Sequence, residues 1–188
     1  NNRIECQSGK SAKEPSLLAG LIFDDLGIRM TPSHAVKKGK RYRYYVSRSL
    51  INGPRADAPR GRRTPAGEIE QLVTKRICQM FQDEALILDT VTTHTNDLAE
   101  QKWLMANISD MAFKWPNKTP TEIRQLLLAL IVRIDILTER VDIQIRPSAL
   151  VQIACEKNLT PLVTKGPTIT MSVVAKLKRT GMETKMII

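Results

Sequence analysis

Basic side chains gather in one stretch of this 188-residue chain, and they are the groups best suited to bind a ligand. Of the 29 Lys and Arg residues, ten lie between positions 37 and 63, where Asp57 is the only acid, so this stretch carries +9 and the rest of the chain +1. Concentrated positive charge attracts polyanions and speeds encounter with them. A solvated basic loop without a ligand is the plain alternative. The ten candidate binding residues are Lys37, Lys38, Lys40, Arg41, Arg43, Arg48, Arg55, Arg60, Arg62 and Arg63.

Other residue types offer little for catalysis or metal binding. The three cysteines are odd in number and scattered, which favours a reducing compartment over a disulfide framework or a zinc knuckle. His34 and His94 stand alone, and no nucleophile–base pair or phosphate-binding loop is recognisable. The longest apolar run, residues 126–132, is too short to span a membrane. We therefore expect no catalytic residue, metal, cofactor or membrane contact, and a cytoplasmic location.

The first part of the chain predicts a small β-meander that presents the basic stretch. Residues 1–15 are polar and aperiodic and are expected to form a linker, and the missing initiator Met suggests a piece of a longer protein. Turns are predicted at residues 24–27 and 38–40, with strands at 28–30, ending before Pro32, and at 41–47. In the second strand, Tyr42 and Tyr44 are expected to pack on helices while Tyr45 faces outward. Stacking of the tyrosines on exposed bases is the alternative.

The middle of the chain predicts four helices. Thr64 and Pro65 are expected to open the first, with Thr64 as its N-cap, and residues 85–91 the second. Thr95 or Asn96 is expected to cap the third, which places Trp103 and Trp115 in the core. Residues 119–122 fit a capping box that starts the fourth.

The last part of the chain returns to strands. Alternating apolar residues predict a hairpin over 132–136 and 141–145, then a short helix over 148–156 and a pair of strands at 168–177 and 183–188. The expected fold class is α+β, with a small basic β-ribbon or meander, a helical middle and C-terminal β-hairpins. We expect a linker at 1–15, a β domain at 16–63, and a helical region with C-terminal hairpins at 64–188 that packs against the β domain.

Several sequence blocks resemble a known family in the same order. Residues 17–30 and 38–47, with the run Tyr42-Arg43-Tyr44-Tyr45, resemble the zinc β-ribbon domain in the C-terminal region of large serine recombinases. Residues 65–70 and the hairpin starting at 130 are also similar to that region. The zinc-bearing members have Cys pairs at the positions of residues 24–27 and after the tyrosines, and this chain has none there. A structural zinc site needs four such ligands, so zinc is expected to be absent and packing on the helices to hold the ribbon.

The resemblance implies a parent enzyme that recombines DNA through a serine nucleophile, in a bacterial or phage-like, nucleoid-associated setting. Nothing in this chain resembles the catalytic domain, so the chain would be the C-terminal part that binds duplex DNA. The hairpin around residues 37–43 would contact phosphates, and an Arg could fork onto a guanine edge. Arg55, Arg60, Arg62 and Arg63 resemble arms that enter a minor groove. The alternatives are a protein-interaction or self-association module of the recombinase, and a binder of single-stranded or structured RNA.

Overall fold

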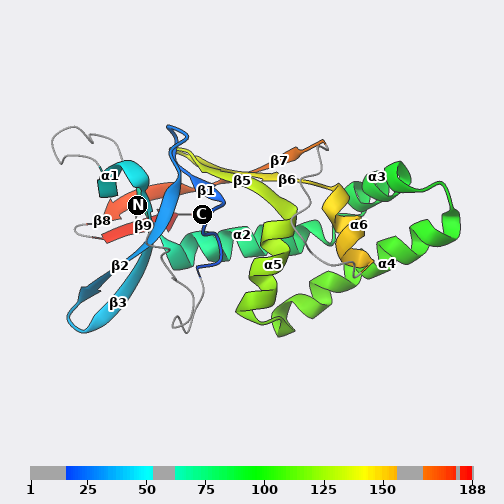
Figure 1. Cartoon of the computed structure of the whole chain (residues 1–188), viewed down its shortest axis with the longest axis horizontal. Coiled ribbons are helices and arrows are strands. Elements are labelled where there is room, and N and C mark those ends of the chain that lie inside the picture. The colour runs from blue at the N-terminus through cyan, green and yellow to red at the C-terminus, as the bar shows by residue number, and fades with distance from the viewer. Residues whose placement is uncertain (1–15, 53–61, 156–166, 181–182, 188) are drawn as a thin grey trace, which may run out of the picture.

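The chain folds as an α+β protein, as expected (Figure 1). The computed structural model describes residues 16–52, 62–155, 167–180 and 183–187, so the predicted linker at 1–15 lies outside the described residues. The described strands are β1 (Ile22–Phe23), β2 (Met30–Lys37), β3 (Lys40–Ser47), β4 (Arg63–Pro65), β5 (Ile131–Ile136), β6 (Arg140–Ile145), β7 (Ile169–Val174), β8 (Lys176–Thr180) and β9 (Glu183–Ile187). The described helices are α1 (Arg48–Asn52), α2 (Ala66–Met80), α3 (Glu84–His94), α4 (Leu98–Lys114), the short 3-10 helix η1 (Trp115–Asn117), α5 (Pro120–Leu130) and α6 (Ser148–Ala154).

The strands form three sheets, ordered β1-β5-β6-β7, β2-β3-β4 and β8-β9. In the structure, β4 adds a third strand to the predicted meander of β2 and β3, while β1 pairs in parallel with β5 of another sheet. The predicted strand at 168–177 is also wrong in part. Its first portion, β7, pairs with β6, and only β8 pairs with β9.

A long hairpin is formed by β2 and β3, which pair from Met30 opposite Ser47 to Lys37 opposite Lys40. Its turn is built from Lys38 and Gly39, with φ of 50° and 74°, the left-handed conformation that two-residue hairpin loops require. The prediction that the first strand ends before Pro32 is wrong. Pro32 has no backbone N–H to donate to a neighbouring strand. It is tolerated in β2 because β2 is the edge strand of its sheet.

The structure confirms one of the three predicted helix caps. Thr119 and Glu122 form the expected capping box at the start of α5. The predicted helix start at Thr64 is wrong, since this residue is in β4 opposite Tyr45 and α2 begins at Ala66. The cap of α4 is Asp97, whose carboxylate accepts from the Ala99 N–H, rather than Thr95 or Asn96.

One hydrophobic cluster joins the two regions on either side of the predicted division at residues 63 and 64. Leu18 and Tyr45 of the first region are fully buried in it together with Ile69 and Ile77 of α2. Helix α2 runs beneath the sheet that holds β5, β6 and β7 (Figure 1). Val132 begins the alternating apolar pattern of the predicted hairpin at 132–145, but it is exposed because the register shifts between Ile131 and Arg133.

Candidate nucleic-acid interface

The hairpin of β2 and β3 divides its side chains between two faces, since successive strand residues point to opposite sides. The inner face is turned toward α2, as the contacts of Arg43 and Tyr45 with Glu70 of that helix show. The alternating residues then lie on the outer face. In β3 and its neighbour β4, the outer face carries Lys40, Tyr42, Tyr44, Val46 and Arg63.

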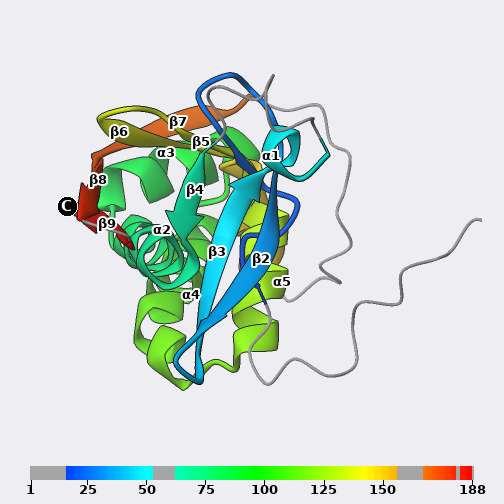
Figure 2. The ribbon, with the colours of Figure 1, turned by 90° about the vertical axis from the view of Figure 1, so that its left-hand side faces the viewer.

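The turn of the hairpin carries four cations, which we call the tip: Lys37, Lys38, Lys40 and Arg41. All four are exposed, and none makes an ion pair with another residue that the structure describes. The turn extends beyond the body of the molecule at the lower left of Figure 1 and lies in front of the body in Figure 2. The tip is therefore a compact positive charge at the end of a two-stranded ribbon.

Two tyrosines of the outer face are covered by cations. The guanidinium of Arg63 lies 3.9 Å from the ring centroid of Tyr44, and the ammonium of Lys40 lies 5.7 Å from that of Tyr42. The expectation that Tyr42 and Tyr44 pack on the helices and Tyr45 faces outward is wrong. Tyr45 is the fully buried residue of the three, while the other two are half-buried.

The inner face is attached to α2 through the carboxylate of Glu70, which is 5% exposed. This carboxylate accepts from the Tyr45 hydroxyl at 2.6 Å and from the Arg43 guanidinium at 3.1 Å. The Tyr45 oxygen in turn accepts from the backbone N–H of Leu18, and Glu70 accepts from that of Leu17. Burial, then the hydrogen bond to Glu70, raises the pKa of Tyr45 well above its usual range. Arg43 therefore serves in holding the hairpin onto the body.

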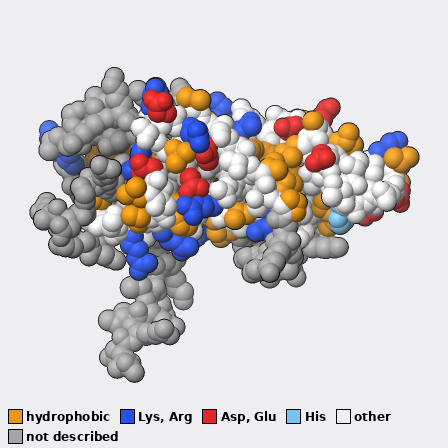
Figure 3. All heavy atoms as spheres, turned by 90° about the horizontal axis from the view of Figure 1, so that it is seen from above, with side chains coloured by type: hydrophobic (Ala, Val, Ile, Leu, Met, Phe, Trp, Pro, Cys, Tyr) orange, Lys and Arg blue, Asp and Glu red, His pale blue; other side chains and the backbone are white. Residues whose placement is uncertain are grey.

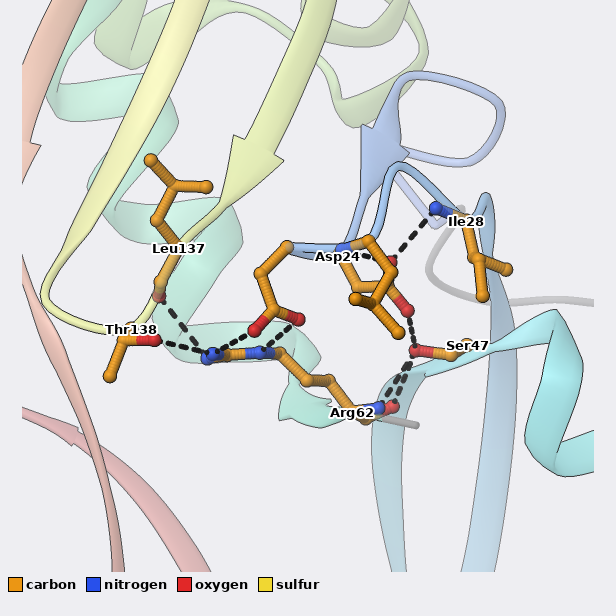
Figure 4. Close-up of polar contacts among 8 residues, drawn as sticks. Asp24, Ile28, Ser47, Arg62, Leu137 and Thr138 are labelled. Atoms are coloured by element: carbon orange, nitrogen blue, oxygen red, sulfur yellow. Dashed lines mark hydrogen bonds and ion pairs between the residues drawn. The ribbon is translucent and has the colours of Figure 1, made fainter. Parts of the chain in front are cut away.

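Arg62 is also occupied inside the protein (Figure 4). It binds both carboxylate oxygens of Asp25, at 2.9 and 2.8 Å, and donates to the Leu137 carbonyl and the Thr138 hydroxyl in the turn between β5 and β6. The guanidinium thus ties the residue before β4 to the turn after β1 and to the turn between β5 and β6. It is not available as a groove-entering arm while these contacts hold.

The turn at residues 24–27 is closed by Asp24, which is 1% exposed. Its carboxylate accepts from the backbone N–H groups of Leu26 and Ile28, and from the Ser47 hydroxyl at 2.6 Å (Figure 4). Gly27, with φ of 72°, completes the turn. Asp24 and Ser47 thus join the turn after β1 to the end of β3. Hydrogen bonds as well as packing therefore hold this part of the hairpin.

Replacing Arg62 with Ala is expected to lower the free energy of unfolding by about 2 kcal/mol, because Asp25 and two further oxygens lose their donor in a partly exposed site. Arg62→Lys keeps the charge but not the two-pronged geometry and is expected to recover only part of the loss. The matched control is Arg63→Ala, which removes an exposed cation over Tyr44 and should cost less than about 1 kcal/mol. Urea unfolding measures both. Equal losses would contradict the role of Arg62.

The remaining candidates are spread over several places. Arg48 is exposed in α1, whereas Arg55 and Arg60 lie outside the described residues. His34 and His94 are both exposed. The prediction that Trp103 is a core residue is wrong, since 52% of it is exposed, although Trp115 is buried.

On the sheet β5-β6-β7, positive and negative side chains pair with each other. The sheet β5-β6-β7 carries the ion pairs Arg133–Asp135 and Arg140–Asp142. The view from above shows acidic and basic groups side by side (Figure 3). The tip differs from this sheet, because four exposed cations lie within five residues there and none forms an ion pair with another described residue.

Among the described residues, no three His, Cys, Asp or Glu side chains lie close enough to hold a metal ion. No helix in the described ranges combines the length and apolar character needed to cross a bilayer. Comparison of the chain with protein-family models, with curated proteins and with solved structures finds no match. The resemblance to serine recombinases therefore stays a prediction from the sequence blocks.

Proposed function

We propose that this chain binds duplex DNA with the tip of its β2–β3 hairpin. The observation that carries the proposal is the gathering of four exposed cations on a projecting two-stranded ribbon. The major groove of B-DNA is about 12 Å wide and admits such a ribbon. Lys37, Lys38 and Lys40 would neutralise phosphates, and Arg41 could also fork onto a guanine edge.

The outer face of the hairpin favours a duplex over a single strand. Single-strand binders stack bases on open aromatic rings. Here Arg63 and Lys40 already lie over the rings of Tyr44 and Tyr42, so a base would have to displace a cation to stack. Lys40 is itself one of the tip cations, so its ammonium lies where the hairpin would contact the backbone of a bound duplex.

The sequence blocks support a wider proposal, that the chain is the C-terminal DNA-binding part of a serine recombinase that acts in DNA recombination or integration. In that role the hairpin would bring the enzyme to its target, and the chemistry would belong to a catalytic domain that this chain does not resemble. The described residues contain their own support for the hairpin, through Glu70 and Arg62, so the proposal needs no zinc.

Affinity for duplex DNA is expected to fall steeply with salt, because binding releases counterions from the phosphates. Four phosphate contacts predict a slope of about −3.6 for log K against log salt concentration. Fluorescence anisotropy with a labelled duplex, between about 50 and 200 mM salt, measures this slope. A slope near zero, or no binding at low salt, would contradict the proposal. Tighter binding to single-stranded DNA or RNA would favour the stacking alternative instead.

A further inference from the structure

A second surface lies on α4, on the side away from the core. Leu104, Ile108 and Ala112 of this helix are buried in the hydrophobic cluster. Helical periodicity puts the residues between these positions on the opposite side, which we call the outer face of α4. In Figure 1, α4 forms the lower right edge of the molecule, with α3 and α6 above it. The outer face consists of Ala99, Lys102, Trp103, Ala106, Asp110 and Phe113.

Two aromatic side chains on this face are largely in water. Phe113 is 76% exposed and Trp103 is 52% exposed. Single exposed apolar residues are common, but here two large aromatic residues lie on one side of one helix together with Ala99 and Ala106, and we call this set the patch. Trp is enriched at the energetic centres of protein interfaces, and aromatic residues dominate the energetics of interfaces. The patch therefore suits a protein partner.

We propose that the partner is a second copy of this chain, bound through the same face with its α4 antiparallel, around a twofold axis next to Ala106. Closed twofold pairing requires a surface that complements itself. Residues at equal distances on either side of Ala106 in the sequence then lie at the same level of the two helices. Phe113 of one copy lies level with Ala99 of the other, so each large ring meets a small side chain.

The charged residues of the outer face of α4 also complement each other across the proposed twofold axis. Lys102 and Asp110 are equally far from Ala106, so each Lys102 lies level with Asp110 of the second copy. Asp110 is already bound by Lys114 of its own helix at 2.7 Å, which orients the carboxylate on this side of α4. Ala106 at the centre has no bulk, and small residues at a crossing permit interaxial distances of about 8 Å.

The size of the patch sets the expected strength. A stable interface buries about 800 Å² on each partner, and one helix face with two aromatic anchors supplies about half of that. We therefore expect a weak, concentration-dependent dimer. The proposal does not depend on the DNA-binding role, because the outer face of α4 shares no residue with the hairpin.

Sedimentation velocity of the whole chain tests the dimer. The average sedimentation coefficient of the wild type is expected to rise with protein concentration. Phe113→Lys should remove this rise, because it deletes an anchor and brings a cation near Lys102 of the second copy. The control is Gln125→Lys, an equal charge change at an exposed position of α5, which should behave as the wild type. A wild type that sediments as a monomer at all concentrations would overturn the proposal.

Disulfide trapping tests the register. The twofold axis puts position 106 next to itself, so Ala106→Cys is expected to form a disulfide-linked dimer under mild oxidation, well beyond any background from the native cysteines. The matched control is Gln125→Cys, whose thiol is exposed but lies on α5. If Ala106→Cys is trapped no more than Gln125→Cys, the antiparallel pairing at Ala106 is wrong.

Discussion

Removing the four cations of the tip is expected to lower the affinity for duplex DNA about 4,000-fold at 0.1 M salt. The variant carries Gln in place of Lys37, Lys40 and Arg41, and Asn in place of Lys38, whose φ of 50° Asn tolerates. Each phosphate contact contributes about a factor of eight at this salt concentration relative to 1 M, because about one counterion is released. The slope of log K against log salt concentration should decrease in magnitude by about one for each lost residue, from about −3.6 to nearly zero.

A loss of DNA affinity could come from the lower net charge of the variant or from the loss of charge at the tip, and a control chain distinguishes the two. The control chain keeps the tip and loses the same four units of charge elsewhere, through Gln79→Glu, Gln82→Glu, Asn96→Asp and Gln125→Glu, all at exposed positions. We expect this control to lose little affinity and to keep most of its salt slope. If the control loses as much as the tip variant, the attraction is a property of the whole molecule and the hairpin is not the interface.

Elements with local signals could be predicted from the sequence. The turn at Lys38 and Gly39, the capping box at Thr119 and the apolar face of α2 depend on residues within a few positions of each other. Such signals act before any tertiary contact forms. The positions of the tip cations follow from the same local pattern, so the sequence could identify the tip as a candidate interface.

Residues with distant partners could not be assigned in this way. The alternation of β3 gives two faces, and the one with Tyr42 and Tyr44 looks more apolar, but Glu70 of α2 makes the face with Arg43 and Tyr45 the inner one. A buried carboxylate that accepts three donors outweighs a difference in hydrophobicity. In the same way, only the fold shows that Arg62 meets Asp25 and the turn at Leu137.

The sequence alone also does not show which of the ten basic residues are available to a ligand. Ten basic residues suggested one continuous strip, but Arg43 and Arg62 bind carboxylates of the protein itself, and Lys40 and Arg41 point to opposite faces of the hairpin. Lys40 and Arg41 still belong to the tip, because both lie next to the two-residue turn at the end of the hairpin. The candidate interface is therefore smaller than the strip and better defined.

The buried carboxylate that supports the hairpin leads to the second large effect. Glu70→Ala is expected to lower the free energy of unfolding by about 3 kcal/mol, because Tyr45, Arg43 and the Leu17 N–H lose an acceptor at a site closed to water. The neighbouring control, Gln71→Ala, changes an exposed residue of the same helix and should stay within about 0.5 kcal/mol of the wild type. Urea unfolding compares the two, and equal stabilities would contradict a structural role for Glu70.

The pH dependence of stability separates this network from a simple loss of packing. Because the pKa of Tyr45 is raised in the folded protein, its contribution is complete below the pKa of an unfolded tyrosine, about 10. Above that pH the unfolded chain releases the proton while the folded chain retains it, so stability falls as pH rises. Tyr45→Phe should be less stable than the wild type at pH 8, but the difference should shrink by about 1.4 kcal/mol for each pH unit above 10. A difference that stays constant up to pH 11 would mean that the pKa of Tyr45 is the same in the folded and unfolded chains. The ring, and not the hydrogen bond to Glu70, would then hold the hairpin.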